Sequence, residues 1–154
     1  MNVLFIDIDG VLNSKRWYDD RPYEAITGRV TEMAQSIDPD AVGRINRIAE
    51  ATGCVIVLSS SWRCLDPIAH IDRALRHRGL VTHLYGATPP IGNPRGAEIE
   101  AWLAMCPTLD AWAILDDDSD MEPHMDALVQ TDGRYGLLDE HAERVIRLLN
   151  TGEQ

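Results

Sequence analysis

Residues 3–13, Val-Leu-Phe-Ile-Asp-Ile-Asp-Gly-Val-Leu-Asn, say more about the architecture and chemistry of this chain than any other segment. The four apolar residues at its start are too few for a helix and predict a strand buried on both faces, as in a parallel sheet. The strand ends in Asp7 and Asp9, and Gly10 then allows a sharp turn and the close approach of a ligand. Because α/β folds bind ligands at the carboxyl ends of parallel strands, this segment predicts a functional site.

The two carboxylates of this segment also point to a bound cation. Acidic side chains so close together repel each other unless a cation or a shared proton relieves them. A helix N-cap is the structural alternative, but a cap needs one acid and Asp7 and Asp9 make two. Mg²⁺ takes oxygen ligands and commonly binds one or two carboxylates together with a substrate phosphate, so we expect Mg²⁺ as the cofactor.

The composition is that of an ordinary globular chain, with 154 residues, 45% hydrophobic and 25% charged, and we expect a single domain over residues 1–154. No apolar run approaches the roughly 18 residues of a membrane span, and a strand stands where a signal segment would begin. We therefore expect a cytoplasmic protein without a membrane partner. The cysteines, Cys54, Cys64 and Cys106, are odd in number and lack CxxC spacing, which favours inert thiols over disulfides, a zinc site or a catalytic thiol.

The net charge of −11 argues against broad electrostatic binding of nucleic acid, which needs a basic face. It leaves room for a local basic lip at the rim of the site. Five arginines fall near the loops of that rim, although solvated surface is the plainer interpretation for each: Arg16, Arg21, Arg29, Arg63 and Arg95. The five histidines show no metal-ligand spacing.

Downstream of the first strand, helical patterns alternate with short apolar runs, which predicts βαβ units and a parallel sheet. Strands are expected at 54–58, 80–84, 112–115 and 127–131. Helices are expected at 38–52, at 66–78 with Asp66 as N-cap, from about Arg95, and at 139–149. Residues 14–37 have no clean periodicity and are interpreted as a loop or small flap over the strand end.

Three of the apolar strands end in polar residues, and parallel strands of the same sense bring such ends to one edge of the sheet. We therefore expect the three groups and Arg95 to share one crevice. A hard divalent cation there would admit a phosphate and leave a carboxylate free as nucleophile. The three groups are Asp7 and Asp9, Ser59 and Ser60, and Asp116 and Asp117.

In order and spacing, these groups resemble the four motifs of the haloacid dehalogenase-like (HAD) phosphohydrolases over nearly the whole chain. The DxDG motif matches residues 7–10, the strand-end serine matches Ser59 or Ser60, and the acidic motif matches residues 116–117. Arg95 stands where the family usually has lysine. The segments FIDIDGVLN, VIVLSSSWR and ILDDD further resemble the HAD phosphatase domain of Swiss-army-knife RNA repair proteins.

The resemblance implies a three-layer, Rossmann-like α/β fold, with about five parallel strands in the order 5-4-1-2-3 flanked by helices. It also implies roles for individual residues. Asp7 is expected to take up the phosphoryl group as an aspartyl-phosphate, and Asp9 to protonate the leaving oxygen and then activate water. Ser59 or Ser60 is expected to bind a phosphoryl oxygen, and Arg95 to offset charge in the transition state.

Mg²⁺ is expected on the Asp7 carboxylate, the Asp9 main-chain carbonyl and Asp117, with Asp116 beside it; which of Asp116 and Asp117 binds the ion directly stays open. Substrate contacts are expected from Gly10, Ser60 and Arg63. A packed Trp62 with a salt-bridged Arg63 is an equally good interpretation. Trp17 and Tyr18 either stack a base or cover the sheet edge. Asp118 and Asp120 either help to orient the site or, as the plainer interpretation, are solvated loop acids or a helix cap.

The gaps at 13–37 and 85–95 are too short for a full cap domain, so the resemblance implies a capless or minimal-flap enzyme with an open cleft. We expect a phosphomonoesterase acting on nucleotides or polynucleotide ends, associated with other nucleic-acid repair enzymes. The alternatives are a capless phosphoprotein phosphatase and a non-catalytic module that binds phosphate or nucleic acid. A phospho-receiver domain fits poorly, because its paired acids are adjacent and it uses a late lysine, whereas the only lysine here is Lys15.

Overall fold

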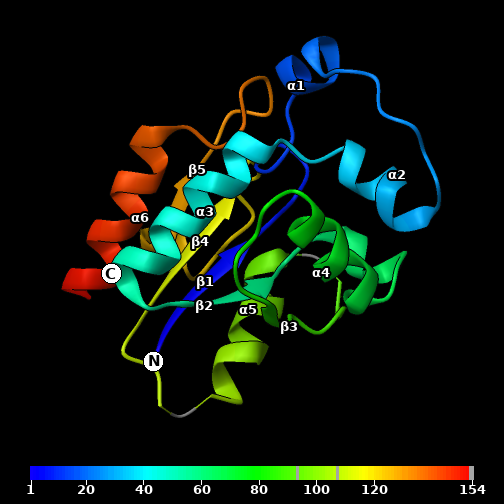
Figure 1. Cartoon of the computed structure of the whole chain (residues 1–154). Helices are drawn as coiled ribbons and strands as arrows, with labels where there is room; N and C mark the ends of the chain where they lie inside the picture. The colour runs from blue at the N-terminus through cyan, green and yellow to red at the C-terminus, as the bar shows by residue number, and fades with distance from the viewer. Residues whose placement is uncertain (93, 107, 153–154) are drawn as a thin grey trace.

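The computed structural model describes residues 1–92, 94–106 and 108–152. Within them, five strands form one sheet in the order β3-β2-β1-β4-β5, and every strand pair is parallel (Figure 1). The predicted α/β class and strand order are confirmed. The strands are β1 (Asn2–Ile6), β2 (Val55–Leu58), β3 (Leu84–Ala87), β4 (Ala111–Asp116) and β5 (Leu128–Gln130).

The register of the three middle strands sets the position of the site. Ile6 of β1 pairs with Leu58 of β2 on one side and with Leu115 of β4 on the other. The next residue of each chain segment therefore lies at the same level of the sheet. These three residues are Asp7 and Ser59, which follow β1 and β2, and Asp116, which is the last residue of β4 and still pairs with Gln130 of β5.

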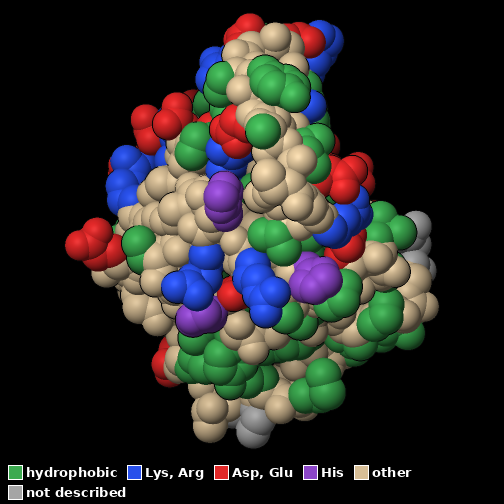
Figure 2. Space-filling model, turned by 45° about the vertical axis from the view of Figure 1, so that its right-hand side comes forward, with side chains coloured by type: hydrophobic (Ala, Val, Ile, Leu, Met, Phe, Trp, Pro, Cys, Tyr) green, Lys and Arg blue, Asp and Glu red, His purple; other side chains and the backbone are tan. Residues whose placement is uncertain are grey.

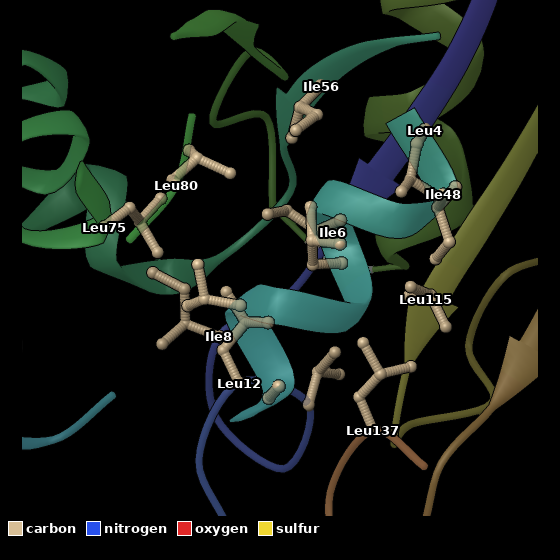
Figure 3. Close-up of a cluster of buried hydrophobic side chains, with 14 of the residues drawn as sticks. Leu4, Ile6, Ile8, Leu12, Ile48, Ile56, Leu75, Leu80, Leu115 and Leu137 are labelled. Atoms are coloured by element: carbon tan, nitrogen blue, oxygen red, sulfur yellow. The ribbon is translucent and has the colours of Figure 1, made fainter. Parts of the chain in front are cut away.

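Alternate side chains of β1 pack into two different apolar clusters, one on each face of the sheet. Leu4 and Ile6 belong to the larger cluster, in which they lie near Ile48 and Leu115 (Figure 3). Its helical members come from α2 (Arg29–Gln35), α3 (Pro39–Thr52), α4 (Ile68–His77) and α6 (Asp139–Thr151).

The opposite face is covered by α5 (Arg95–Ala104). There Phe5 of β1 meets Trp102 of α5 edge to face, with ring centroids 5.3 Å apart. The strand is thus buried on both sides, which explains its uninterrupted apolar run. Among the described residues, no helix combines the length and apolar character needed to cross a bilayer.

The segment interpreted as a loop, residues 14–37, contains two short helices, α1 (Lys15–Asp20) and α2 (Arg29–Gln35). The loop interpretation was wrong, and the alternative of a small flap remains, because α1 buries no residue and α2 buries only Met33 and Ala34. None of the α1 residues is buried, and its start is fixed by the Ser14 hydroxyl, which accepts a hydrogen bond from the Trp17 N–H at 3.1 Å. Short helices of this kind depend on caps and tertiary contacts rather than on intrinsic propensity.

Two further expectations are corrected. The third strand lies at Leu84–Ala87 instead of 80–84, because Leu80 is a buried core residue in the turn that follows α4, while Val81 is exposed. Asp66 does not cap α4, whose N-cap Pro67 makes no side-chain hydrogen bond. The Asp66 carboxylate is instead paired with Arg29 of α2.

Two short 3-10 helices complete the described elements. η1 (Ser61–Cys64) follows β2, and η2 (Met125–Ala127) precedes β5.

Two glycines in helices offer a matched test of how tightly α5 is seated. A Cβ at Gly96 would lie 2.2 Å from the Glu122 carbonyl oxygen, whereas a Cβ at Gly43 of α3 would meet nothing within 4 Å. We expect Gly96→Ala to destabilise the protein by about 1–3 kcal/mol through overpacking. Gly43→Ala should stabilise it by about 0.5–1 kcal/mol, since alanine favours the helix interior. Urea unfolding followed by circular dichroism measures both, and equal effects of the two variants would contradict the close seating of α5.

Candidate active site

Three carboxylates from two neighbouring strands meet at the carboxyl end of the sheet. Asp7 follows β1, Asp116 ends β4 and Asp117 comes next, and one oxygen of each lies within 4.8 Å of the others. Asp116 is fully buried, Asp7 nearly so, and Asp117 is half-buried. The sheet therefore brings together acids that lie more than 100 positions apart in the sequence.

Arg95, the first residue of α5, places a guanidinium among these acids. Its Nη1 lies 2.8 Å from the Asp7 Oδ2 and 2.9 Å from the Asp116 Oδ2. The same nitrogen donates to the Ser59 carbonyl oxygen at 2.7 Å. One guanidinium thus faces three carboxylates, so negative charge remains in excess.

The pKa shifts of the acids show this imbalance. Burial raises the pKa of Asp7, and the Arg95 charge and the Ser60 hydroxyl oppose the rise. Burial and the neighbouring Asp7 raise the pKa of Asp116 to about 7. Burial, Asp118 and Asp7 also raise the pKa of Asp117. Closely spaced, hard oxygen donors with uncompensated charge are the donor set that suits Mg²⁺.

Gly10 is required by the close approach of Asp117. Its φ of +75° lies in the left-handed region that favours glycine. A Cβ at this position would lie 2.2 Å from the Asp117 Oδ2, so the predicted space for a ligand beside Gly10 is filled by this carboxylate. The buried Thr131, which sequence reasoning missed, donates to the Gly10 carbonyl oxygen at 2.8 Å and fixes the turn.

Asp9 lies outside the cluster of three acids and is exposed. Two neutral donors hold its carboxylate: the Asn13 side-chain amide donates to Oδ1 at 2.8 Å, and the Trp62 indole N–H donates to Oδ2 at 3.0 Å. Asn13 also accepts a hydrogen bond from the Gly10 N–H at 2.9 Å. Sequence reasoning missed Asn13, although it belongs to the same motif, and it did not connect Trp62 with Asp9.

The two serines after β2 differ in their partners. Ser60 is fully buried and accepts a hydrogen bond from the Trp62 N–H at 3.4 Å, and its hydroxyl lowers the pKa of Asp7. The Ser59 hydroxyl oxygen is also buried, and it has no hydrogen-bond partner within the described part of the chain. Both serines lie at the strand end where they were expected.

The guanidinium of Arg63 forms its contacts inside the protein, which argues against a contact with substrate. Its guanidinium pairs with the buried Glu98 and donates to the Thr88 carbonyl oxygen at 2.9 Å. Glu98, another residue that sequence reasoning missed, also accepts the N–H groups of Ile91 and Gly92 at 3.0 Å each. The salt-bridged interpretation of Arg63 is therefore the correct one.

The loop after β4 holds the start of α5 in place. The Asp120 carboxylate accepts the Arg95 N–H at 3.0 Å, and the Asp120 carbonyl oxygen accepts the Gly96 N–H at 3.0 Å. The Asp118 N–H donates to the Asp116 carboxylate at 3.0 Å. Asp120 thus matches the orienting role weighed for it in the sequence, because it fixes the backbone from which Arg95 reaches the acids, while the N-cap of α5 is Pro94.

The predicted basic lip is absent from most of its expected positions in the described ranges. Arg29 pairs with Asp66, and Arg21 donates to the Gln35 carbonyl oxygen, as does the Trp17 indole N–H. Trp17 is thus tied to the flap, which supports its covering role. Exposed basic side chains gather instead on the outer face of α4, where Figure 2 shows Lys/Arg and His side chains together; they include Arg73, Arg76 and His77.

Comparison with known proteins identifies the family. The family model described as the HAD domain in Swiss Army Knife RNA repair proteins matches residues 3–142, which include every acid, serine and arginine of the site. No curated protein and no solved structure gave a significant match. Membership in a HAD family suggests a hydrolase. With more than half of its length matched, the chain belongs to the family of HAD domains in Swiss Army Knife RNA repair proteins.

Proposed function

We propose that this chain is a Mg²⁺-dependent phosphomonoesterase that works through an aspartyl-phosphate on Asp7. Its substrates are the phosphates of nucleotides or polynucleotide ends. The proposal is supported above all by one arrangement: Asp7 lies within 4.8 Å of the oxygens of Asp116 and Asp117 and 2.8 Å from Arg95. Each group has a separate task in phosphoryl transfer.

The acids at the sheet edge fit a magnesium ion, since their oxygens are close together and their pKa values are raised. Asp7, the Asp9 carbonyl oxygen and Asp117 would hold it, with Asp116 kept beside them by Arg95 and the Asp118 N–H. When bound, the ion would neutralise the acids and polarise a phosphoryl oxygen, which lets an anionic substrate enter.

In the first step, an Asp7 carboxylate oxygen attacks phosphorus and the bond to the leaving oxygen breaks, while Asp9 gives that oxygen a proton. In the second step, Asp9 takes a proton from water, which attacks phosphorus and releases inorganic phosphate from Asp7. Arg95 offsets the charge on the phosphoryl oxygens, and the Ser59 or Ser60 hydroxyl donates to one of them. Arg95 also favours the ionised, nucleophilic form of Asp7, since its charge lowers the pKa of that carboxyl.

The surroundings of Asp9 suit a general acid and base. The carboxylate is exposed, so it can reach both a leaving group and a water molecule. Its orientation is fixed by the donors on Asn13 and Trp62. Both donors are neutral groups, so they position the carboxylate without forming an ion pair with it.

Two observations support nucleotides or polynucleotide ends as the substrate. The matching family is described by its occurrence in RNA repair proteins, which also suggests partner enzymes of nucleic-acid repair. The segment after the first motif holds only the short helices α1 and α2, so a large substrate end can approach Asp7.

The first test is a phosphate-release screen with Mg²⁺ over mononucleotides, 5′- and 3′-phosphorylated oligonucleotides and phosphopeptides. We expect release from the nucleotide substrates and loss of all release in Asp7→Asn, because an amide cannot form the aspartyl-phosphate. Asp20→Asn, at an exposed position on α1, serves as the matched control and should keep full activity. Release that persists in Asp7→Asn would contradict the covalent mechanism.

The second test follows the stability of the metal-free protein against pH. The pKa of Asp116 rises from 3.8 to about 7 in the fold, so the folded state favours the protonated form and loses stability as pH rises between these values. In EDTA we expect a loss on the order of 4 kcal/mol across the whole range, at about 1.4 kcal/mol per pKa unit, of which about 3 kcal/mol falls above pH 5.

Thermal unfolding at pH 5 and pH 8 measures this loss. Mg²⁺ should raise the melting temperature more at pH 8 than at pH 5, because it replaces the proton as the compensating charge. In Asp116→Asn the pH dependence should be weaker. An unchanged pH dependence in this variant would show that Asp116 is not the group responsible.

A further inference from the structure

We propose that the cavity between α2 and η1 binds the leaving group of the substrate, and that it accepts the planar ring of a nucleobase. The inference rests on the proposed phosphatase function and extends it to a specificity site. The cavity has a volume of about 170 Å³. Its walls come from α2 and its end, and from η1 and the residues after it: Arg29, Glu32, Met33, Ser36, Trp62, Leu65 and Asp66.

The size of the cavity limits its occupant to one small ring system. An apolar protein cavity of about 150 Å³ holds a benzene molecule. Pockets for drug-sized ligands are larger, at roughly 300–1,000 Å³. The cavity therefore suits a single heterocycle and not a stretch of oligonucleotide or a folded peptide segment.

Trp62 connects the cavity to the chemistry. Its ring forms part of the cavity wall, and its indole N–H donates to the Asp9 Oδ2 at 3.0 Å. In the proposed mechanism Asp9 protonates the oxygen that leaves phosphorus. The group attached to that oxygen would therefore lie beside Asp9, next to Trp62 in the cavity wall.

The chemistry of the walls selects a neutral ring with hydrogen-bond donors. Trp62, Met33 and Leu65 offer apolar surface, and base–aromatic stacking tolerates any base. Glu32 and Asp66 add carboxylate oxygens that can accept hydrogen bonds from ring or exocyclic N–H groups.

Among these lining residues the only cation is Arg29, and it is already committed to acids. It donates to the Asp66 carboxylate at 2.9 and 2.5 Å and to Glu32 at 3.0 Å. A second phosphate or an acidic peptide would therefore meet carboxylates without a free positive charge. The walls favour a nucleobase over either of these groups.

The cavity is also held open by contacts on both sides. The Arg29–Asp66 pair joins α2 to the segment before α4. Arg78, which follows α4, binds Glu24 through two hydrogen bonds of 2.7 and 2.9 Å and donates to the Ala34 carbonyl oxygen at 2.5 Å. Preformed walls reduce the entropic cost of binding, so even a single ring can contribute measurable affinity.

Titration calorimetry with free nucleosides tests the cavity without requiring hydrolysis. The probes are cytidine, uridine, adenosine and guanosine, with ribose as the control that lacks a base, and the protein is the full chain. We expect the nucleosides to bind and ribose to give no heat. Leu65→Ala should weaken nucleoside binding about threefold to tenfold by removing apolar wall area. Val81→Ala, at another exposed apolar position outside the cavity, should leave it unchanged.

Trp62→Phe separates the two contributions of this residue, because it keeps an aromatic wall and removes the N–H on Asp9. Nucleoside affinity should change by about twofold or less, since a ring face remains for stacking. The kcat for a nucleoside monophosphate should fall while its KM stays within about twofold, because the N–H that positions Asp9 is lost and the ring face remains. A nucleoside affinity that falls as far in Trp62→Phe as in Trp62→Ala would overturn the stacking assignment.

Kinetics then link the cavity to the reaction. The ratio of kcat/KM for a nucleoside monophosphate to that for glycerol phosphate should exceed one and should fall in Leu65→Ala. Nucleosides that fail to bind, or that lose as much affinity in Val81→Ala as in Leu65→Ala, would overturn the proposal. If nucleosides bind as expected while no phosphate is released from any substrate, the cavity assignment stands and the phosphatase function falls.

Discussion

The repulsion among three carboxylates at the carboxyl end of a buried sheet is the constraint on which the rest of the site depends. The register of β1 against β4 brings Asp7 and Asp116 level, and the next residue, Asp117, lies against the Gly10 turn. Like charges at such separations destabilise a fold unless cations compensate them. Arg95 supplies one fixed positive charge between Asp7 and Asp116. The remaining negative charge is the basis for expecting a metal ion and, with it, an affinity for phosphate.

Several layers of contacts keep this arrangement in place. Asp120 fixes the backbone of Arg95 from the loop after β4, and Thr131 fixes the Gly10 turn from the segment after β5. The buried pair of Arg63 and Glu98 organises the loop between β3 and α5. Supporting residues of this kind orient a reactive group without touching the substrate, and the precision of a catalytic site depends on them.

Much of the fold and of the site followed from sequence because buried parallel strands leave a simple signature. Residues 3–6 are apolar without interruption since both faces of β1 are covered, and the polar residues after each strand mark one sheet edge. The helices of the flap escaped detection because α1 buries no side chain and α2 buries only Met33 and Ala34. The third strand was misplaced because Leu80 is buried in the core although it lies in the turn after α4 and not in a strand. The contact of Trp62 with Asp9, across 53 positions, exists only in the folded chain and has no local signal.

The pairs that anchor α2 to the body of the protein have a bearing on how selectivity arises. Enzymes that enclose their substrates usually do so with a hinged lid, and the opening of that lid often limits turnover. Here salt bridges of Arg29 with Asp66 and of Arg78 with Glu24 tie the corresponding segment to the rest of the protein. The proposed nucleobase cavity would therefore have preformed walls. In the proposed function, such a cavity would select substrates by shape and hydrogen-bonding complementarity, and the bound substrate itself would exclude solvent from the reacting phosphorus.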